Sequence, residues 1–139
     1  MRELLWRKTL TKTDAQKQLG NPTGDLRLTR AKFLVNGNSI DQTQYFRHTV
    51  FQSENWIEKE GKHPKEICTA IFQIFIDGEL LGEDSLEIQH KPSGEANQSN
   101  YTTGIRWGPW LSHILINEVN CTGKNLSLYK DEKYVIEID

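Results

Sequence analysis

The chain has 139 residues, of which 36% are hydrophobic and 26% charged, and its formal net charge is −2. This composition is typical of a globular protein and excludes a disordered tail, and the length predicts one domain over residues 1–139. The small net charge excludes a protein that binds polyanions over its whole surface, because nonspecific affinity for nucleic acid grows with the number of phosphates neutralised.

Positive charge is concentrated near the N-terminus. Between residues 7 and 32, seven lysines and arginines stand against only two acids, Asp14 and Asp25. Any contact with a polyanion is therefore expected to be local, and this basic segment is the first place to look for it.

The two cysteines, Cys68 and Cys121, are flanked by strand-like and loop-like sequence and lack the spacing of a metal site. We interpret both as free, reduced thiols. The sequence shows no signal segment and no apolar run near the roughly 18 residues of a membrane helix, so we expect a soluble, cytoplasmic protein.

The N-terminal half alternates short strands with polar connections. Glycine and proline interrupt a polar segment at residues 11–25, and the turn Asn36-Gly37-Asn38 favours a hairpin. A helix is expected to begin after Ser39 or Asp41 and to run to about Phe51, because apolar residues recur at helical spacing. Strands are predicted at residues 4–10, 26–28 and 31–35.

The C-terminal half contains the strongest strand signal. Residues 69–77 are rich in β-branched and aromatic side chains, and the turn Asp77-Gly78 leads into an alternating run at residues 79–90, which together predict a hairpin. A second polar segment at residues 91–101 has no aliphatic side chain larger than alanine. After it we expect a strand at 102–107, a helix at 110–119, and strands at 126–129 and 134–138.

The charged segment 54–65 is interpreted as an exposed connection, apart from Trp56-Ile57, which could pack back onto the core. The total is about seven strands and two helices. Many short strands with helices between them favour a small, mainly β barrel or sandwich over a parallel α/β sheet.

The two polar segments concentrate the side chains that read DNA. Arginine and lysine bind guanine, asparagine and glutamine bind adenine, carboxylates accept from cytosine, and hydroxyls and glycine amides suit phosphates. Each segment could also be an ordinary solvated loop, but two such long connections between strands favour a functional role. We call residues 12–27 the first arm and residues 90–103 the second arm.

Candidate DNA-binding residues follow from this chemistry. In the first arm they are Lys12, Thr13, Asp14, Gln16, Lys17, Gln18, Asn21, Thr23, Gly24, Asp25 and Arg27. In the second arm they are His90, Lys91, Ser93, Gly94, Glu95, Asn97, Gln98, Asn100, Tyr101 and Thr102, and Arg106 follows just beyond. Carboxylates near phosphates need a cation, so Asp25 with Arg27 and Glu95 with Lys91 are the expected pairs.

Three strings within these arms, at residues 11–16, 21–29 and 90–96, resemble the DNA-recognition domains of bacterial restriction endonucleases. These domains belong to the plant "B-three" DNA-binding pseudobarrel superfamily, which includes the effector domain of EcoRII and the recognition domain of BfiI. The resemblance extends over nearly the whole chain. It implies a seven-stranded open barrel with two helices whose two arms enter the major groove of double-stranded DNA.

The resemblance also implies what the chain lacks by itself. Such domains are usually fused to a nuclease, and nothing nuclease-like fits within this length, so we expect a monomeric, non-catalytic recognition domain without cofactor or metal. Its parent would be a type II site-specific deoxyribonuclease. A member of the EcoRII branch would recognise a site resembling CCWGG.

Two other classes of function have some support in the sequence. Asp84 and Glu87 faintly resemble the metal-binding carboxylates of a nuclease, but they are too close in sequence for that site and the lysine position is occupied by Gln89. The histidines lack zinc-site spacing with the cysteines. A carbohydrate-binding sandwich is the alternative, with surface tryptophans as the platform, although core packing explains most of them better; the four are Trp6, Trp56, Trp107 and Trp110.

Overall fold

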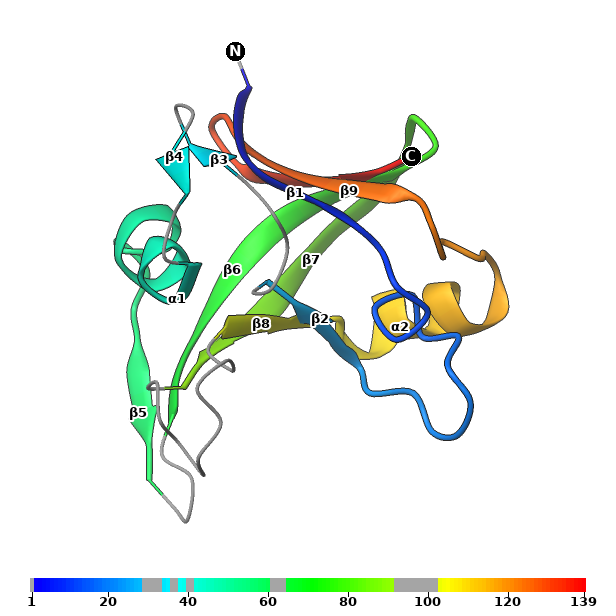
Figure 1. Cartoon of the computed structure of the whole chain (residues 1–139), viewed down its shortest axis with the longest axis horizontal. Coiled ribbons are helices and arrows are strands. Elements are labelled where there is room, and N and C mark those ends of the chain that lie inside the picture. The colour runs from blue at the N-terminus through cyan, green and yellow to red at the C-terminus, as the bar shows by residue number, and fades with distance from the viewer. Residues whose placement is uncertain (1, 29–33, 36–37, 40–41, 61–64, 92–102) are drawn as a thin grey trace.

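The computed structural model describes residues 2–28, 34–35, 38–39, 42–60, 65–91 and 103–139. Within these ranges the chain is mainly β, with one strongly curled sheet that stays open on one side (Figure 1). No helix in the described part of the chain is long and apolar enough to cross a membrane.

Seven strands of the described residues follow one another along this sheet, in the order β1-β9-β10-β6-β7-β8-β2. The short strand β5 pairs with β6 outside this path, and β3 and β4 form a separate two-stranded pair. The seven-stranded open barrel that the sequence predicted is therefore present. The strands are β1 (Glu3–Thr9), β2 (Asp25–Arg27), β3 (Leu34–Val35), β4 (Asn38–Ser39), β5 (Ile57–Lys59), β6 (Lys65–Ile76), β7 (Glu79–His90), β8 (Thr103–Arg106), β9 (Asn125–Lys130) and β10 (Tyr134–Ile138).

The longest element is the predicted hairpin of β6 and β7. Its turn uses positive φ angles at Asp77 (52°) and Gly78 (81°), the conformation that an Asp-Gly turn adopts at low cost. Alternate residues of β6 from Cys68 to Ile76 are buried, as its apolar pattern requires. The hairpin forms the centre of the sheet and is visible as the two long green strands in Figure 1.

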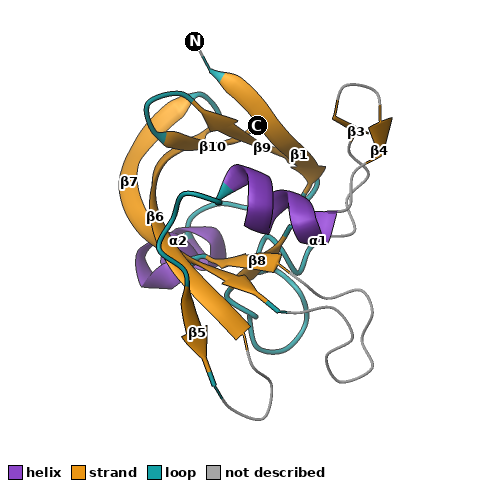
Figure 2. Cartoon of the chain, turned by 90° about the vertical axis from the view of Figure 1, so that its left-hand side faces the viewer, coloured by secondary structure: helices purple, strands orange, loops and turns teal. Residues whose placement is uncertain are grey.

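Helices lie at the two ends of the curled sheet (Figures 1 and 2). The first is α1 (Gln42–Tyr45), which continues as one π-helical segment, η1 (Phe46–Val50). The second is α2 (Gly108–Asn117), which starts two residues before the predicted position because Pro109 is compatible with the first turn of a helix. Asp41, one of the two expected helix caps, lies outside the described residues.

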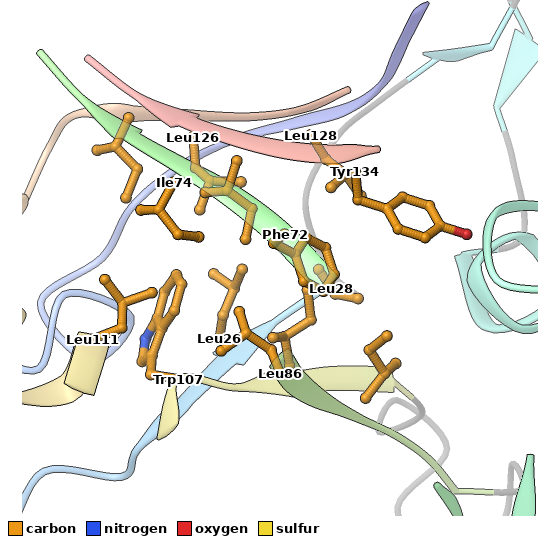
Figure 3. Close-up of a cluster of buried hydrophobic side chains, with 14 of the residues drawn as sticks. Leu26, Leu28, Phe72, Ile74, Leu86, Trp107, Leu111, Leu126, Leu128 and Tyr134 are labelled. Atoms are coloured by element: carbon orange, nitrogen blue, oxygen red, sulfur yellow. The ribbon is translucent and has the colours of Figure 1, made fainter. Parts of the chain in front are cut away.

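The core fills the inside of the curled sheet (Figure 3). Leu26 of β2, Phe72 of β6 and Leu128 of β9 are completely buried. Leu111 and Leu115 of α2 are also completely buried, at one end of the core. Each such side chain contributes roughly 1.5–3 kcal/mol by its burial. Trp6 and Trp107 are wholly buried as well, which confirms the packing interpretation for these two of the four tryptophans.

The segment before β6 differs from its prediction in one respect. It contains β5, whose three residues are all exposed and so lack the alternation that identifies a strand in sequence. Trp56 packs partly against the core as expected, whereas Ile57 remains 58% exposed. Cys68 and Cys121 are buried and free, in agreement with the prediction. Burial raises the pKa of Cys68 to about 12, so this thiol is unreactive at neutral pH.

Candidate nucleic-acid interface

The first arm leaves the end of β1 and returns to the start of β2 (Figure 1). The structure divides it into two parts. Its base, formed by residues 11–16 and 23–24, packs on the barrel, and its tip, residues 18–22, projects from it. Leu19 at the tip is fully exposed, whereas Ala15 at the base is fully buried.

The arm base begins with a capping box between Thr11 and Asp14. The Thr11 hydroxyl accepts a hydrogen bond from the Asp14 N–H (3.1 Å), and a carboxylate oxygen of Asp14 accepts one from the Thr11 N–H (3.1 Å). Lys8 of β1 forms an ion pair with the same carboxylate at 3.0 Å. Asp14 is only 2% exposed, so its side chain builds the arm base and cannot reach a base pair.

Gln16 joins the two ends of the arm. Its Nε2 donates to the Thr13 carbonyl at 2.8 Å, and its Oε1 accepts from the Gly24 N–H at 2.6 Å. The residue itself has a positive φ of 62° and is 3% exposed. Like Asp14, Gln16 was predicted to contact DNA, and the structure gives it an internal bonding role instead.

Trp107 fixes the arm base to the barrel. Its indole Nε1 donates to the Asp14 carbonyl at 2.9 Å, and its backbone N–H donates to the Gly24 carbonyl at 2.8 Å. Gly24 has a φ of 76°, which favours glycine at this sharp return into β2. This contact could not be predicted from local sequence patterns, because Trp107 lies 93 residues from Asp14.

The other residues of the first arm differ in their surroundings. Lys17 extends to the C-terminal end of α2, where its Nζ donates to the Ile116 carbonyl, so it is directed away from the tip. Gln18 closes the tip through a hydrogen bond from its Nε2 to the Asn21 carbonyl at 2.8 Å. Among the candidate DNA-binding residues of the arm, the side chains that remain exposed are Lys12, Thr13, Asn21, Thr23 and Arg27.

A group of cations surrounds Asp25 at the end of the first arm. Asp25 of β2 pairs with Arg106 of β8, and Arg27 pairs with Gly104. On the other edge of β8, Gly104 pairs with Gln89 of β7. These residues therefore share the face of the sheet that points away from the core. Burial raises the pKa of the Asp25 carboxyl, and nearby cations oppose this effect. These cations, which we call the cationic cluster, are Arg106, Lys65, Lys91 and Arg27.

The expected pairing of Asp25 with Arg27 differs from the ion pair that the structure shows. Asp25 forms its ion pair with Arg106, with 3.7 Å between Oδ1 and Nη1, and Arg27 acts on the carboxylate only as one of the more distant charges. The pair is half-exposed on both sides, so it contributes little stability. It leaves the Arg106 guanidinium at the surface.

The second arm is described only at its two ends. His90 ends β7 and is 6% exposed, with its Nδ1 3.2 Å from the Thr103 hydroxyl at the start of β8. Burial lowers the pKa of His90, and Arg47 and His48 lower it further, while Glu66 opposes them. His90 therefore joins the strands that carry the second arm and is not exposed for base contact. The candidates Ser93, Gly94, Glu95, Asn97, Gln98, Asn100, Tyr101 and Thr102, with the expected Glu95–Lys91 pair, lie outside the described residues.

The attachment points of the two arms lie at opposite ends of the β2–β8 pair. The first arm ends at Gly24, beside Asp25 and Arg106, and β8 begins at Thr103, whose carbonyl accepts from the Leu28 N–H at 3.1 Å. Three residues of extended strand span about 10 Å, close to the roughly 12 Å width of the major groove. Of the cationic cluster, Arg106 and Arg27 lie between these points, whereas Lys91 follows His90, the strand partner of Thr103.

The nuclease-like carboxylates do not form a common site. Asp84 and Glu87 are three residues apart on β7, so they point to opposite faces of the sheet. The tryptophans likewise form no common platform, since Trp6 and Trp107 are in the core and the Arg47 guanidinium covers Trp56 at 4.5 Å.

Comparisons of the chain with protein-family models, with curated proteins and with solved structures found no match.

Proposed function

We propose that this chain binds double-stranded DNA in a sequence-specific way, with the tip of the first arm in the major groove and the cationic cluster on the phosphates. One observation carries the proposal. Arg106 lies 3.7 Å from the Asp25 carboxylate, and the charges of Lys65, Lys91 and Arg27 also act on that carboxylate, in a protein whose net charge is −2. Such local positive charge attracts a polyanion to one place without giving the whole protein surface nonspecific affinity for nucleic acid.

The shape of the arm supports base reading over simple charge attraction. A buried base holds a short tip in place, and Asn21 on that tip is exposed with its amide available. An asparagine side chain can bond N6 and N7 of adenine at once. A rigid mount lowers the entropy lost when the tip becomes ordered on DNA.

Asp25 has a specific role in this proposal. A carboxylate among phosphate-binding cations is unfavourable unless it accepts a hydrogen bond, and the amino group of cytosine is the base donor that suits it. Replacing Asp25 with Asn should therefore increase affinity for random DNA while reducing the preference for the selected site.

The resemblance to restriction-endonuclease recognition domains adds to these physical arguments. The open barrel that it implies is present, and the two arms leave it between β1 and β2 and between β7 and β8. On this basis we propose that the domain serves a site-specific deoxyribonuclease as its recognition part, with a site resembling CCWGG as the first one to test.

The decisive experiment selects bound duplexes from a random pool and then measures the affinity of the selected duplex as a function of salt. If the whole cationic cluster contacts phosphates, the logarithm of the affinity should fall with the logarithm of salt concentration with a slope of about −3 to −4. Lys65→Ala and Arg106→Ala should each weaken selected and random duplexes alike and reduce the slope by about 1.

The matched control is Lys133→Ala, which removes an exposed cation that is paired with Glu83 away from the cationic cluster. It should leave affinity and slope unchanged. A selection that enriches no sequence, or equal effects of all three substitutions, would refute sequence-specific binding by this surface.

A further inference from the structure

An open groove lies between α2 and the turn of the β6–β7 hairpin. Trp110 and Ile114 lie four residues apart on α2, so they form one stripe beside the buried stripe of Leu111 and Leu115, and Glu118 follows just after the helix ends. The groove has a volume of about 440 Å³, and its lining includes Asp77, Glu79 and Leu81 of the hairpin and Trp110, Ile114 and Glu118 on the side of α2.

The floor of the groove is apolar and contains a half-exposed tryptophan. Trp110 is 39% exposed, and its ring lies over Gly82, where an added Cβ would be 3.5 Å from the indole Cη2. Ile114, Leu81 and Val119 are only partly buried against the core. A partly exposed tryptophan beside aliphatic side chains is the kind of residue that contributes most at protein interfaces.

The rim of the groove is acidic. Asp77 is paired with Lys124 at 2.9 Å, but within the part of the chain that the structure describes Glu79 and Glu118 take part in no ion pair. Glu118 also follows the C-terminal end of α2, where Lys17 already donates to the Ile116 carbonyl and supplies one cation to the helix end. The carboxylates of Glu79 and Glu118 are the rim groups that a cationic ligand would pair with.

We propose that this groove binds a short basic amphipathic segment of another protein, with its apolar side chains on Trp110 and its lysines or arginines at Glu79 and Glu118. The acidic rim repels nucleic acid and anionic membrane surfaces, so the charge favours a protein segment of opposite sign. This inference is independent of DNA binding.

The test is a selection from a displayed library of random peptides of about 15 residues, which is enough for four helical turns, on the intact chain. The recovered peptides should combine lysine or arginine with leucine, phenylalanine or tryptophan. Their affinity, measured by titration calorimetry, should fall roughly tenfold in Trp110→Ala and in the double variant Glu79→Lys with Glu118→Lys.

The control reverses two exposed acids elsewhere, Glu58 and Glu132, to lysine, and should leave peptide affinity unchanged. Circular dichroism establishes that each variant is folded. The proposal is overturned if no peptide is recovered, if the peptides lack basic residues, or if both double variants bind equally. Self-association of the chain that Trp110→Ala abolishes would also overturn it, because the occupant would then be a second copy.

Discussion

The base and the tip of the first arm have similar polar compositions but very different surroundings. Asp14 and Gln16 at the base are almost wholly buried and bonded within the protein, whereas Leu19 and Asn21 at the tip face solvent. The difference shows that a polar side chain in an arm can be part of its internal structure, and only an exposed one is available to a ligand. Burial and internal hydrogen bonds separate the two roles, and substitutions can test the separation.

The largest effect is expected at Asp14. Asp14→Ala removes the capping box and leaves Lys8, only 12% exposed, without its carboxylate, so the free energy of unfolding should fall by about 3 kcal/mol. Urea denaturation measures it. Asn21→Ala at the tip is the matched control and should change stability by less than about 0.5 kcal/mol. Equal losses in the two variants would remove the distinction between base and tip.

Gln16 should have the next largest effect. Gln16→Ala leaves the Gly24 N–H without its partner, while the Thr13 carbonyl keeps only the backbone N–H of residue 16, and an unsatisfied group of this kind costs about 1–3 kcal/mol. Thr13→Ala, an exposed substitution in the same segment, serves as the control in the same denaturation experiment. A fully stable Gln16→Ala protein would show that the two ends of the arm are held together by other contacts.

At the tip we expect a change in DNA preference and no loss of stability. Asn21→Ala should reduce discrimination at one base pair of the selected site by about 1–3 kcal/mol and leave the affinity for random duplexes nearly unchanged. Competition binding with single-substitution duplexes measures this. If Asn21→Ala weakens every duplex by the same factor, the tip contacts phosphates and does not read bases.

The smallest effect is expected at His90, at the base of the second arm, and it concerns the pH dependence of stability. Burial lowers the pKa of His90, so the unfolded chain, with a histidine pKa of about 6.5, binds the proton more readily than the folded one. This contribution is complete above that pH, and the free energy of unfolding should decrease as pH falls below it. In His90→Gln the free energy of unfolding should decrease less between pH 6.5 and the lower folded-state pKa than in the unmodified chain. If the two proteins show the same pH profile, His90 does not have a lowered pKa in the folded state.

Much of the fold could be predicted from local sequence patterns. The β-branched and aromatic residues at 69–77, the Asp77-Gly78 turn and the alternation at 79–90 identified the central hairpin, and apolar spacing identified α2. Other features depend on contacts far apart in the sequence. The pairing of β2 with β8 joins residues about eighty positions apart, and β5 has no buried side chain to reveal it.

The candidate site was predictable only as a set of residue types. Composition located the first arm, but it could not show that Asp14 and Gln16 are internal, because their partners are backbone groups and the distant Trp107. The cationic cluster was missed in part for the same reason. Lys65 belongs to it only because β6 brings its N-terminal end close to Asp25.

The most direct test of the account is a titration of the chain with its selected duplex, followed by the backbone amide signals in nuclear magnetic resonance spectra. The account predicts large shifts at Leu19, Gly20 and Asn21 and at Arg27, Lys65 and Arg106, with small shifts around Trp110. Shifts centred on the acidic groove, or no shifts at the arm tip, would contradict it.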